Sequence, residues 1–414
     1  MAGESIYNPV AFSMAIKSMN IVPGDVINLM DDATITTNIY IGGSESYPVT
    51  IKRWSGASRV RVNGKVYIEG NNIRFENIEF YYGNWPTRLS TLSGHNPTDL
   101  PIDKSFDIYG ENVELYRCKI HDLADNGFWK AALNFKMSEC LIYYTGCFGE
   151  DGVTYGHGIY TQNEEDNKIF DKNIIFFNGG FGVKLSGDTG MGKNVELTNN
   201  IFFEQSKQFT DTGSEFYIGS FQSSILYSNI KFNNNELFRR YYGIGNFGAE
   251  GGIDGYEFKN NYLCMLDGLY TCLAINGHLS NGEFSGNIIH TKLPNDINTN
   301  LAVLDETNTI SNNTISEPPT TGIRTRLIIC DSTRGHLVIY NYASASTVDA
   351  DCSDLLSEGD SYRLTNVQDW ANDIITGTAG ANGIITVPMT GHTIAAPVAW
   401  TAPASTFPVF GCFI

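Results

Sequence analysis

One short phrase of alternating apolar and polar residues recurs along the chain. It consists of an apolar alternation, then Asn or a small polar residue, and then a second apolar alternation. The copies read IRFENIEF from Ile73, VELYRCKI from Val113, FKMSECLIY from Phe135, IFDKNIIFF from Ile169, VELTNNIFF from Val195, IKFNNNELF from Ile230, YEFKNNYLCM from Tyr256, EFSGNIIH from Glu283 and TISNNTIS from Thr309. Alternation with a period of two is typical of strands that bury one face, so each copy predicts two short strands joined at a corner.

Aligning the copies predicts nine stacked rungs. The equivalent apolar residues are Ile78, Ile120, Ile142, Ile174, Ile201, Leu237, Leu263, Ile288 and Ile315, separated by 22 to 42 residues. A repeat of this length predicts a solenoid, because one coil cannot bury its apolar face without neighbours stacked about 4.8 Å away. Asn at each corner tolerates a left-handed backbone and can bond the rungs above and below. A β-sandwich is the alternative, but sandwiches rarely repeat one phrase nine times.

The N-terminal segment is suited to capping the solenoid. Residues 9–19 have helical apolar spacing, and the turn Pro23-Gly24-Asp25 leads into an apolar run at 26–30. With its repeats, the chain resembles the right-handed parallel β-helix (pectate-lyase-like) superfamily over about residues 8 to 332. The resemblance implies an all-β fold with an N-terminal cap and first strands at 1–65 and a right-handed parallel β-helix at 66–332.

The phrase stops near residue 335, and the remaining chain has short apolar runs and a tail rich in Ala and Pro. We expect residues 333–414 to form a separate C-terminal β region. It either caps the helix or carries contacts between subunits, because an apolar tail is costly to leave exposed.

Charge and cysteine content exclude several classes. The formal charge is −18, from 27 basic and 45 acidic residues, which argues against nucleic acid as a partner. It also weighs against polyanionic substrates, since these need local cations, and the sequence shows no cluster of them. The eight Cys include no CxxC pair, so we expect no metal site and no cofactor. Cys118 and Cys140 fall at equivalent places in successive repeats, which predicts stacked buried thiols rather than a disulfide.

The start of the chain bears on location. The first twenty residues lack a basic segment followed by an apolar one, and no apolar run long enough to span a membrane occurs. We therefore expect no membrane insertion and a location in a virion. If a signal segment was removed, the expected location is extracellular.

The richest chemical segment is the loop at 150–163. Here His157 or Tyr160 would act as base or acid, Asp151 or Glu150 as its partner, and Lys184, one coil onward, as the cation for a substrate carboxylate. The tripeptide at 156–158 matches the GHG motif of polygalacturonase-type hydrolases, but their NTD and RIK motifs are absent. The alternative is that His157 and Tyr160 are corner residues bonded to the next coil.

Aromatic residues on predicted insertions are a second candidate site. Tyr81, Tyr82, Trp85, Tyr241 and Tyr242 could stack on sugar rings as a glycan-binding platform. The alternative is that they pack their loops onto the helix.

Two function classes follow. The first is a virion surface protein, such as a phage spike, fibre or capsid decoration, forming a homotrimer that contacts other virion proteins or cell-surface polysaccharide. The alternative is a carbohydrate-active enzyme, a polysaccharide lyase, glycoside hydrolase or epimerase, working in a groove on the helix. The incomplete catalytic motifs and the acidic composition favour the first class, and with it a protein that is not an enzyme.

Overall fold

The chain divides into two compact units, Met1–Ser316 and Glu317–Ile414. The computed structural model describes residues 21–30, 32–34, 39–92, 97–103, 105–124, 133–151, 154–186, 192–206, 213–220, 222, 224–241, 243–249, 251–268, 271–302 and 304–414. The N-terminal helix expected at 9–19 lies outside these residues. No helix among them is long and apolar enough to cross a bilayer.

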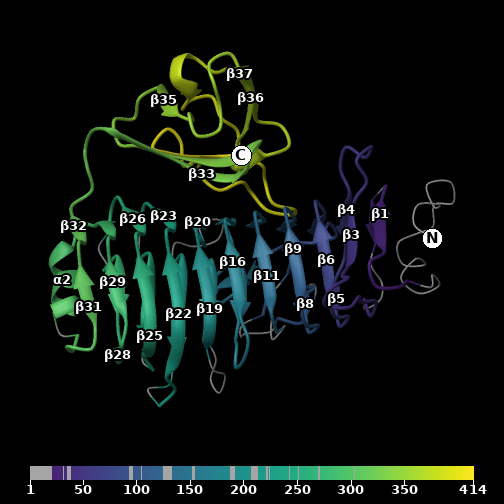
Figure 1. The fold of residues 1–414 in the computed structure, drawn as a ribbon, viewed down its shortest axis with the longest axis horizontal. Helices are drawn as coiled ribbons and strands as arrows, with labels where there is room; N and C mark the ends of the chain where they lie inside the picture. The colour runs from purple at the N-terminus through teal and green to yellow at the C-terminus, as the bar shows by residue number, and fades with distance from the viewer. Residues whose placement is uncertain are drawn as a thin grey trace. The chain divides into compact units, whose positions relative to one another are not determined.

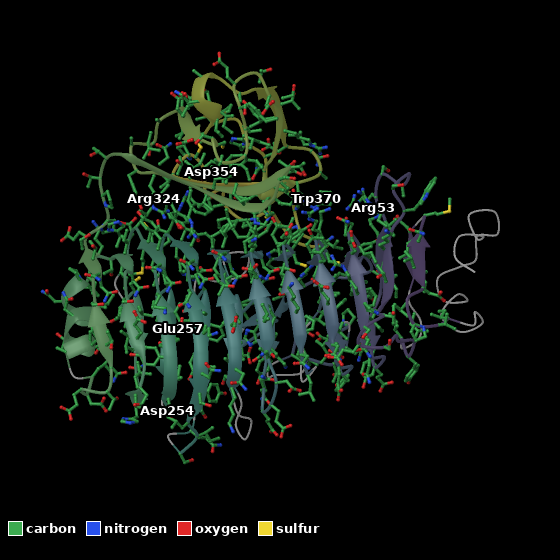
Figure 2. The ribbon with its side chains drawn as sticks, in the orientation of Figure 1. Arg53, Asp254, Glu257, Arg324, Asp354 and Trp370 are labelled. Atoms are coloured by element: carbon green, nitrogen blue, oxygen red, sulfur yellow. The ribbon has the colours of Figure 1, made fainter. Side chains whose placement is uncertain are left out.

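The first unit is built from parallel sheets in which sequential coils lie side by side (Figure 1). Sheet A contains, in order, β1 (Val26–Leu29), β3 (Val49–Arg53), β6 (Ile73–Glu76), β9 (Val113–Tyr116), β11 (Phe135–Ser138), β16 (Lys168–Asp171), β19 (Lys193–Thr198), β22 (Tyr227–Asn233), β25 (Ile253–Lys259), β29 (Glu283–Ser285) and β31 (Thr309–Ser311), with β28 (Leu279–Ser280) paired to β25. Its strands alternate inward apolar residues with outward charged ones. On that outward face Lys259 pairs with Glu257 and Glu283, and Figure 2 labels Glu257 there.

Sheet B follows each strand of sheet A after a corner. It contains β2 (Ala33–Thr34), β4 (Arg61–Asn63), β7 (Glu79–Tyr81), β10 (Lys119–His121), β12 (Leu141–Tyr143), β17 (Ile174–Phe176), β20 (Ile201–Phe203), β23 (Glu236–Arg239), β26 (Tyr262–Met265), β30 (Ile288–His290) and β32 (Thr314–Ser316). Two strands, β2 and β4, therefore precede the first of the nine rungs expected from the repeats.

Sheet C forms the third side of five consecutive coils. It contains β15 (Ile159–Thr161), β18 (Val183–Leu185), β21 (Phe216–Ser220), β24 (Gly245–Ala249) and β27 (Leu273–Ile275). Three smaller elements complete the unit: the parallel pair β5 (Val66–Ile68) and β8 (Phe106–Ile108), the antiparallel pair β13 (Cys147–Phe148) and β14 (Thr154–Tyr155), and helix α2 (Pro294–Ala302). The expected all-β, right-handed parallel β-helix is thus confirmed.

Apolar side chains fill the interior in continuous columns. In sheet A, Phe232, Phe258 and Phe284 stack from rung to rung with ring centroids 5.1 and 4.8 Å apart, and all three are fully buried. Burying such a side chain stabilises the fold by about 1.5–3 kcal/mol. Stacking, rather than any single coil, therefore supplies the core.

The corner between sheets A and B contains two residues with different roles. At the corner from β19 to β20, Asn199 takes the left-handed conformation (φ 54°), and Asn200 turns inward and is buried. The Asn200 Nδ2 atom donates to Asn235 Oδ1 of the next rung at 3.2 Å and to the Phe170 carbonyl at 2.8 Å. The same ladder runs through Asn173, Asn200, Asn235, Asn261, Asn287 and Asn313.

Two cysteines continue this ladder toward the N-terminal rungs. The Cys140 backbone N–H donates to Asn173 Oδ1 at 3.0 Å, and the Cys118 N–H donates to Cys140 Sγ at 3.3 Å. Both are buried free thiols. They occupy matching corner positions, as the repeat alignment implies.

The register of sheet B corrects part of the repeat alignment. Ile120, Ile142, Leu237, Leu263 and Ile315 do align, as expected. At the other four rungs the aligned residues are Phe80, Ile175, Phe202 and Ile289, in place of Ile78, Ile174, Ile201 and Ile288. A slip of one residue reverses which side chain points inward. Alternation cannot resolve this choice in Ile174-Ile175 or Ile201-Phe202, because both neighbours are apolar and buried.

The second unit is antiparallel. Its strands are β33 (Ile323–Asp331), β34 (Arg334–Asn341), β35 (Thr347–Asp351), β36 (Ser361–Thr365), β37 (Ile374–Thr378), β38 (Ile384–Pro388) and β39 (Phe410–Phe413), with short 3-10 helices η2 (Val367–Asp369) and η3 (Ala381–Gly383). They pair as β33-β34-β39, β35-β38 and β36-β37 around a separate apolar core. The unit begins at Glu317 rather than at 333, because β33 pairs with β34 and not with a coil of the helix.

Candidate functional site

Sheet C brings together two of the residues expected to carry chemistry, Tyr160 and Lys184. Tyr160 of β15 pairs in register with Lys184 of β18, which pairs with Tyr217 of β21. Their neighbours Ile159, Val183 and Phe216 are fully buried in the core, so these three side chains lie on the outward face. Tyr160 and Lys184 are each half-buried.

His157 lies beside this pair. Its ring is 5.5 Å from the Tyr160 ring in an edge-to-face arrangement, and the Lys184 Nζ atom lies 4.8 Å from the centroid of the Tyr160 ring. An ammonium over an aromatic face is a cation–π contact. The arrangement therefore presents an amine, a phenol and an imidazole on one surface.

His157 is bonded to the following coil. Its Nδ1 atom accepts a hydrogen bond from the Phe181 backbone N–H at 2.9 Å, which places the proton of the neutral ring on Nε2. Burial, together with the charge of Lys184, lowers the pKa of His157 to about 3. His157 is therefore a neutral imidazole at physiological pH. Its hydrogen bond to the following coil matches the alternative given for it, that of a corner residue bonded to the next coil.

Glycines explain why this segment reads GHG. Gly156 has a φ of 90°, a conformation that side chains rarely adopt, and a Cβ atom on Gly158 would lie 2.6 Å from the Gly182 carbonyl oxygen. Neither position accommodates a larger residue without strain. The motif therefore follows from the tight stacking of coils around His157.

The expected carboxylate partners have contacts of their own. Asp151 accepts from the Tyr155 hydroxyl at 3.5 Å, and the backbone N–H of Glu150 donates to the Leu92 carbonyl. Neither carboxylate contributes to the pKa shift of His157. The structure thus brings His157, Tyr160 and Lys184 together, and the role of Glu150 or Asp151 as a partner stays a prediction.

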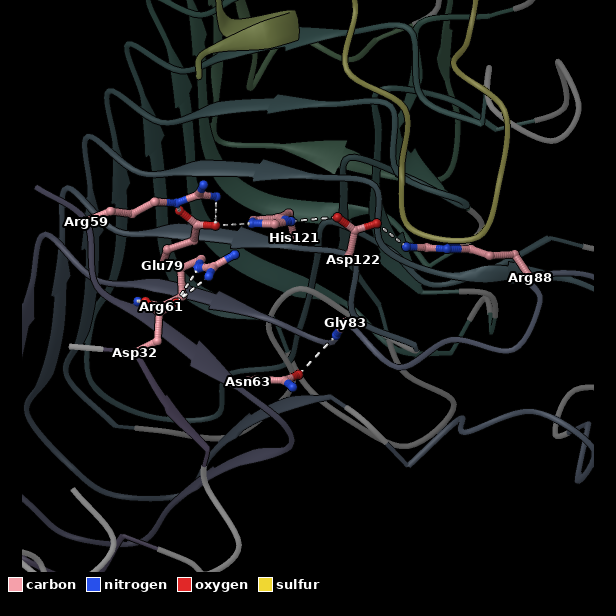
Figure 3. Close-up of polar contacts among 9 residues, drawn as sticks. All are labelled: Asp32, Arg59, Arg61, Asn63, Glu79, Gly83, Arg88, His121 and Asp122. Atoms are coloured by element: carbon pink, nitrogen blue, oxygen red, sulfur yellow. Dashed lines mark hydrogen bonds and ion pairs between the residues drawn. The ribbon is translucent and has the colours of Figure 1, made fainter. Parts of the chain in front are cut away.

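A second cluster, on sheet B, was not anticipated from the sequence. Figure 3 shows His121 of β10 held between two carboxylates, with Nε2 3.0 Å from Glu79 Oε1 and Nδ1 2.6 Å from Asp122 Oδ2. Arg59 pairs with the Glu79 carboxylate at one end, and Arg88 pairs with Asp122 at the other. We call these five residues the His121 network.

Electrostatics hold this network in its charged form. Burial works against the carboxylate of Glu79, but hydrogen bonds from His121 and Arg59 outweigh it and lower the pKa of Glu79 to about 2. Burial likewise opposes a charged imidazole, yet the hydrogen bonds to Asp122 and Glu79 outweigh it and raise the pKa of His121. Both ring nitrogens of His121 already serve these carboxylates. The ring therefore fixes its neighbours and does not offer a proton to a substrate.

Aromatic rings enclose His121 on both sides. Its ring stacks on Tyr143 at 4.8 Å and on Tyr81 at 5.6 Å. The Arg61 guanidinium lies 5.6 Å from the Tyr81 ring centroid and pairs with Asp32. Arg59 and Arg61 keep 40% and 38% of their side chains exposed, so they form the solvent edge of the network.

The residues expected to bind glycans differ in accessibility. Tyr81 is half-buried next to His121, and Tyr82 is half-buried against the core. Trp85 is buried, donates from Nε1 to the Asp122 carbonyl and lies under Arg88, so it packs its loop. Tyr241 is exposed, and Tyr242 lies outside the described residues.

These features define the chain as a right-handed parallel β-helix protein. No family model matches the sequence, and no curated protein matches it either. Among solved structures, the chain is similar to a rhamnogalacturonan lyase at 14% identity, covering 72% of this chain and 80% of that one (TM-score 0.47). It is also similar to an alginate lyase from Paenibacillus sp. at 14% identity, covering 74% and 96% (TM-score 0.46). PfbA, a surface adhesin of Streptococcus pneumoniae, matches at 9% identity, covering 77% and 87% (TM-score 0.38).

Proposed function

We propose that the protein is a carbohydrate-active enzyme that removes the proton beside the carboxylate of a uronate polymer, as polysaccharide lyases and epimerases do. The reaction would take place on the outward face of sheet C. The observation that carries the proposal is the placement of Lys184 over the ring of Tyr160, next to a neutral His157.

This chemistry requires few groups. A cation must offset the sugar carboxylate, because the proton on the adjacent carbon is acidic only when that charge is neutralised. A base then removes the C5 proton. In elimination the released electron pair forms the C4–C5 double bond, the bond from C4 to the glycosidic oxygen breaks, and an acid protonates the leaving oxygen. In epimerisation a proton returns to C5 from the opposite face.

The sheet C residues match these requirements. In the proposal the Lys184 ammonium pairs with the sugar carboxylate, and the Tyr160 hydroxyl, on the same face, transfers the proton. His157, held by the Phe181 N–H, positions the Tyr160 ring.

Hydrolysis has less support. Glycoside hydrolases generally use two carboxyl groups about 5–9.5 Å apart across the scissile bond. Of the carboxylates expected near His157, Asp151 accepts from Tyr155, and the charge that lowers the pKa of His157 comes from Lys184. A cation beside a phenol is suited to proton abstraction, whereas hydrolysis would use a pair of carboxyl groups.

The geometry therefore favours the second of the two function classes expected from the sequence. The pectate, rhamnogalacturonan and alginate lyases among the structures of similar fold are of the same reaction class, although the proposal rests on the side chains of sheet C. The virion location and the homotrimer stay predictions.

Hydrogen exchange at C5 tests the proposal directly. Uronate polysaccharides of several types are incubated with the protein in D₂O, and proton NMR follows loss of the C5 signal, which reports both elimination and epimerisation. We expect exchange with at least one polymer. Lys184→Met and Tyr160→Phe should each slow it by about 100-fold or more, the range of general acid–base catalysis.

The matched control is Lys231→Met. Lys231 is also an outward lysine with a partly exposed side chain, but it lies on sheet A and pairs with Glu196 at 2.7 Å. We expect the Lys231→Met variant to catalyse C5 exchange at the same rate as the unmodified protein. Absence of C5 exchange across the panel, or equal rates in all variants, would rule out catalysis on sheet C.

A further inference from the structure

We propose that the outward face of sheet B carries a separate binding site for carboxylated glycans, formed by Arg59, Arg61 and Tyr81. We call these three residues the arginine rim. The inference concerns binding alone and does not depend on catalysis at sheet C.

The rim combines cationic and aromatic groups on one edge. Arg59 and Arg61 alternate with the buried Val60 and Val62, so both point outward, and the charge of Arg61 acts on Arg59. Arg61 also lies over the face of Tyr81. A guanidinium can bind a carboxylate with paired hydrogen bonds, and a neighbouring tyrosine ring can pack against a sugar face.

The His121 network fixes the rim in place. Arg59 donates from Nε to Glu79 Oε2 at 2.7 Å, and Glu79 in turn accepts from His121. Tyr81 is stacked on the same imidazole. Arg61 donates from Nε to Asp32 Oδ2 at 2.7 Å and from its backbone N–H to Asp32 Oδ1 at 2.9 Å. A surface whose side chains are already ordered loses less entropy when a ligand binds.

The charge of the surrounding segment suits an anionic ligand. Residues 51–136 contain twelve Lys and Arg against ten Asp and Glu, whereas the whole chain has a formal charge of −18. An acidic protein repels a polyanion over most of its surface, so the ligand is directed to the segment that is not acidic. The rim lies within that segment, and its two arginines are substantially exposed.

The two carboxylates of the His121 network each have more than one partner of opposite charge. Glu79 and Asp122 are each bonded to His121 as well as to an arginine. Arg59 and Arg88 match these two carboxylates in number, so a protonated His121 gives the network a positive excess.

Calorimetry with defined oligosaccharides tests the inference. The probes are a uronate oligosaccharide, a neutral glucose oligosaccharide of the same length, and polyglutamate as a polyanion without sugar. We expect binding of the uronate probe only, weakened by added salt. Arg61→Gln should reduce the affinity by about tenfold, the effect of losing one charge-assisted contact. Asp32→Asn, which releases Arg61 from its partner, should increase it.

Arg74→Gln is the matched control. Arg74 has 32% of its side chain exposed and pairs with Glu114, but it lies on sheet A. Its substitution should leave the affinity unchanged, and circular dichroism verifies the fold of each variant. Equal binding of polyglutamate, equal losses in Arg61→Gln and Arg74→Gln, or no uronate binding would each overturn the inference. Lys184→Met should retain this affinity, so failure here is distinguishable from failure of the proposed catalysis.

Discussion

His121 and His157 lie in the same β-helix, yet their surroundings drive their protonation in opposite directions. His121 has a carboxylate on each ring nitrogen, and these hydrogen bonds raise its pKa although burial opposes the charge. His157 accepts a backbone N–H on Nδ1 and faces Lys184, and burial with that charge lowers its pKa to about 3. The surroundings of His121 thus favour the charged imidazolium, and those of His157 favour the neutral ring.

The difference shows how one architecture supplies two kinds of surface. Around His121, each charged group has a partner of opposite charge; Arg88 is buried, and Arg59 lies at the solvent edge. Around His157, the described contacts include one ammonium and a phenol, which suits proton transfer. We propose that the first surface binds a ligand and that the second carries the chemistry.

Breaking the buried end of the His121 network should have the largest effect. Arg88→Met leaves Asp122 buried without its arginine, although His121 still donates to it. Removing one partner of a buried ion pair costs about 3–5 kcal/mol in the free energy of unfolding. Urea denaturation measures it. Arg74→Met, at a partly exposed pair, should cost less than about 1 kcal/mol, and equal costs would show that the network is not specially buried.

Removing the imidazolium itself should have a smaller effect that depends on pH. His121→Gln loses two hydrogen bonds to charged groups, a cost of about 2–3 kcal/mol near pH 6. Because the folded pKa of His121 is raised, its contribution is complete below the unfolded value and disappears as pH rises through the folded value. Urea midpoints of both proteins across pH 5–9 should therefore converge at high pH. A difference that stays constant would contradict a charged His121.

His157 should show the opposite trend and the smallest effect at neutral pH. His157→Asn keeps an acceptor for the Phe181 N–H, so we expect a loss of about 1 kcal/mol at pH 7. Its lowered pKa means that the unfolded chain binds a proton below pH 6.5 while the folded chain does not until about pH 3. The unmodified protein should therefore lose more stability on acidification than the variant. Parallel stability curves between pH 6.5 and 4 would argue against a neutral His157.

Much of the fold could be predicted because the repeat is local in sequence. Each copy of the phrase contains its own corner, and the Asn at that corner identifies the turn between sheets A and B. The register of the strands in sheet B was harder to predict. At Ile174-Ile175 the outward neighbour is as apolar as the inward one, so alternation alone gives no choice.

The two sites differed in the same way. His157 and Tyr160 are three residues apart, and Lys184 lies one coil onward. Because they are close in sequence, the sequence alone predicts that they lie together. Arg59, Glu79, Arg88 and His121 come from separate segments that parallel register brings together. The sequence does hold one signal for this network, a polar ring at the last position of a sheet B strand. That position holds Tyr81 and His121 in neighbouring rungs, whereas later rungs hold Phe176 and Phe203 there.

The two-residue corner between sheets A and B limits where this protein can change length. From β6–β7 to β31–β32, all nine corners contain two residues. A residue added there would displace a ladder side chain and shift the register of a whole rung. The other corners already differ in length from coil to coil. Peptides for a new epitope, tag or binding loop should therefore be grafted at those variable corners, which leaves the asparagine ladder as an unaltered frame for engineering.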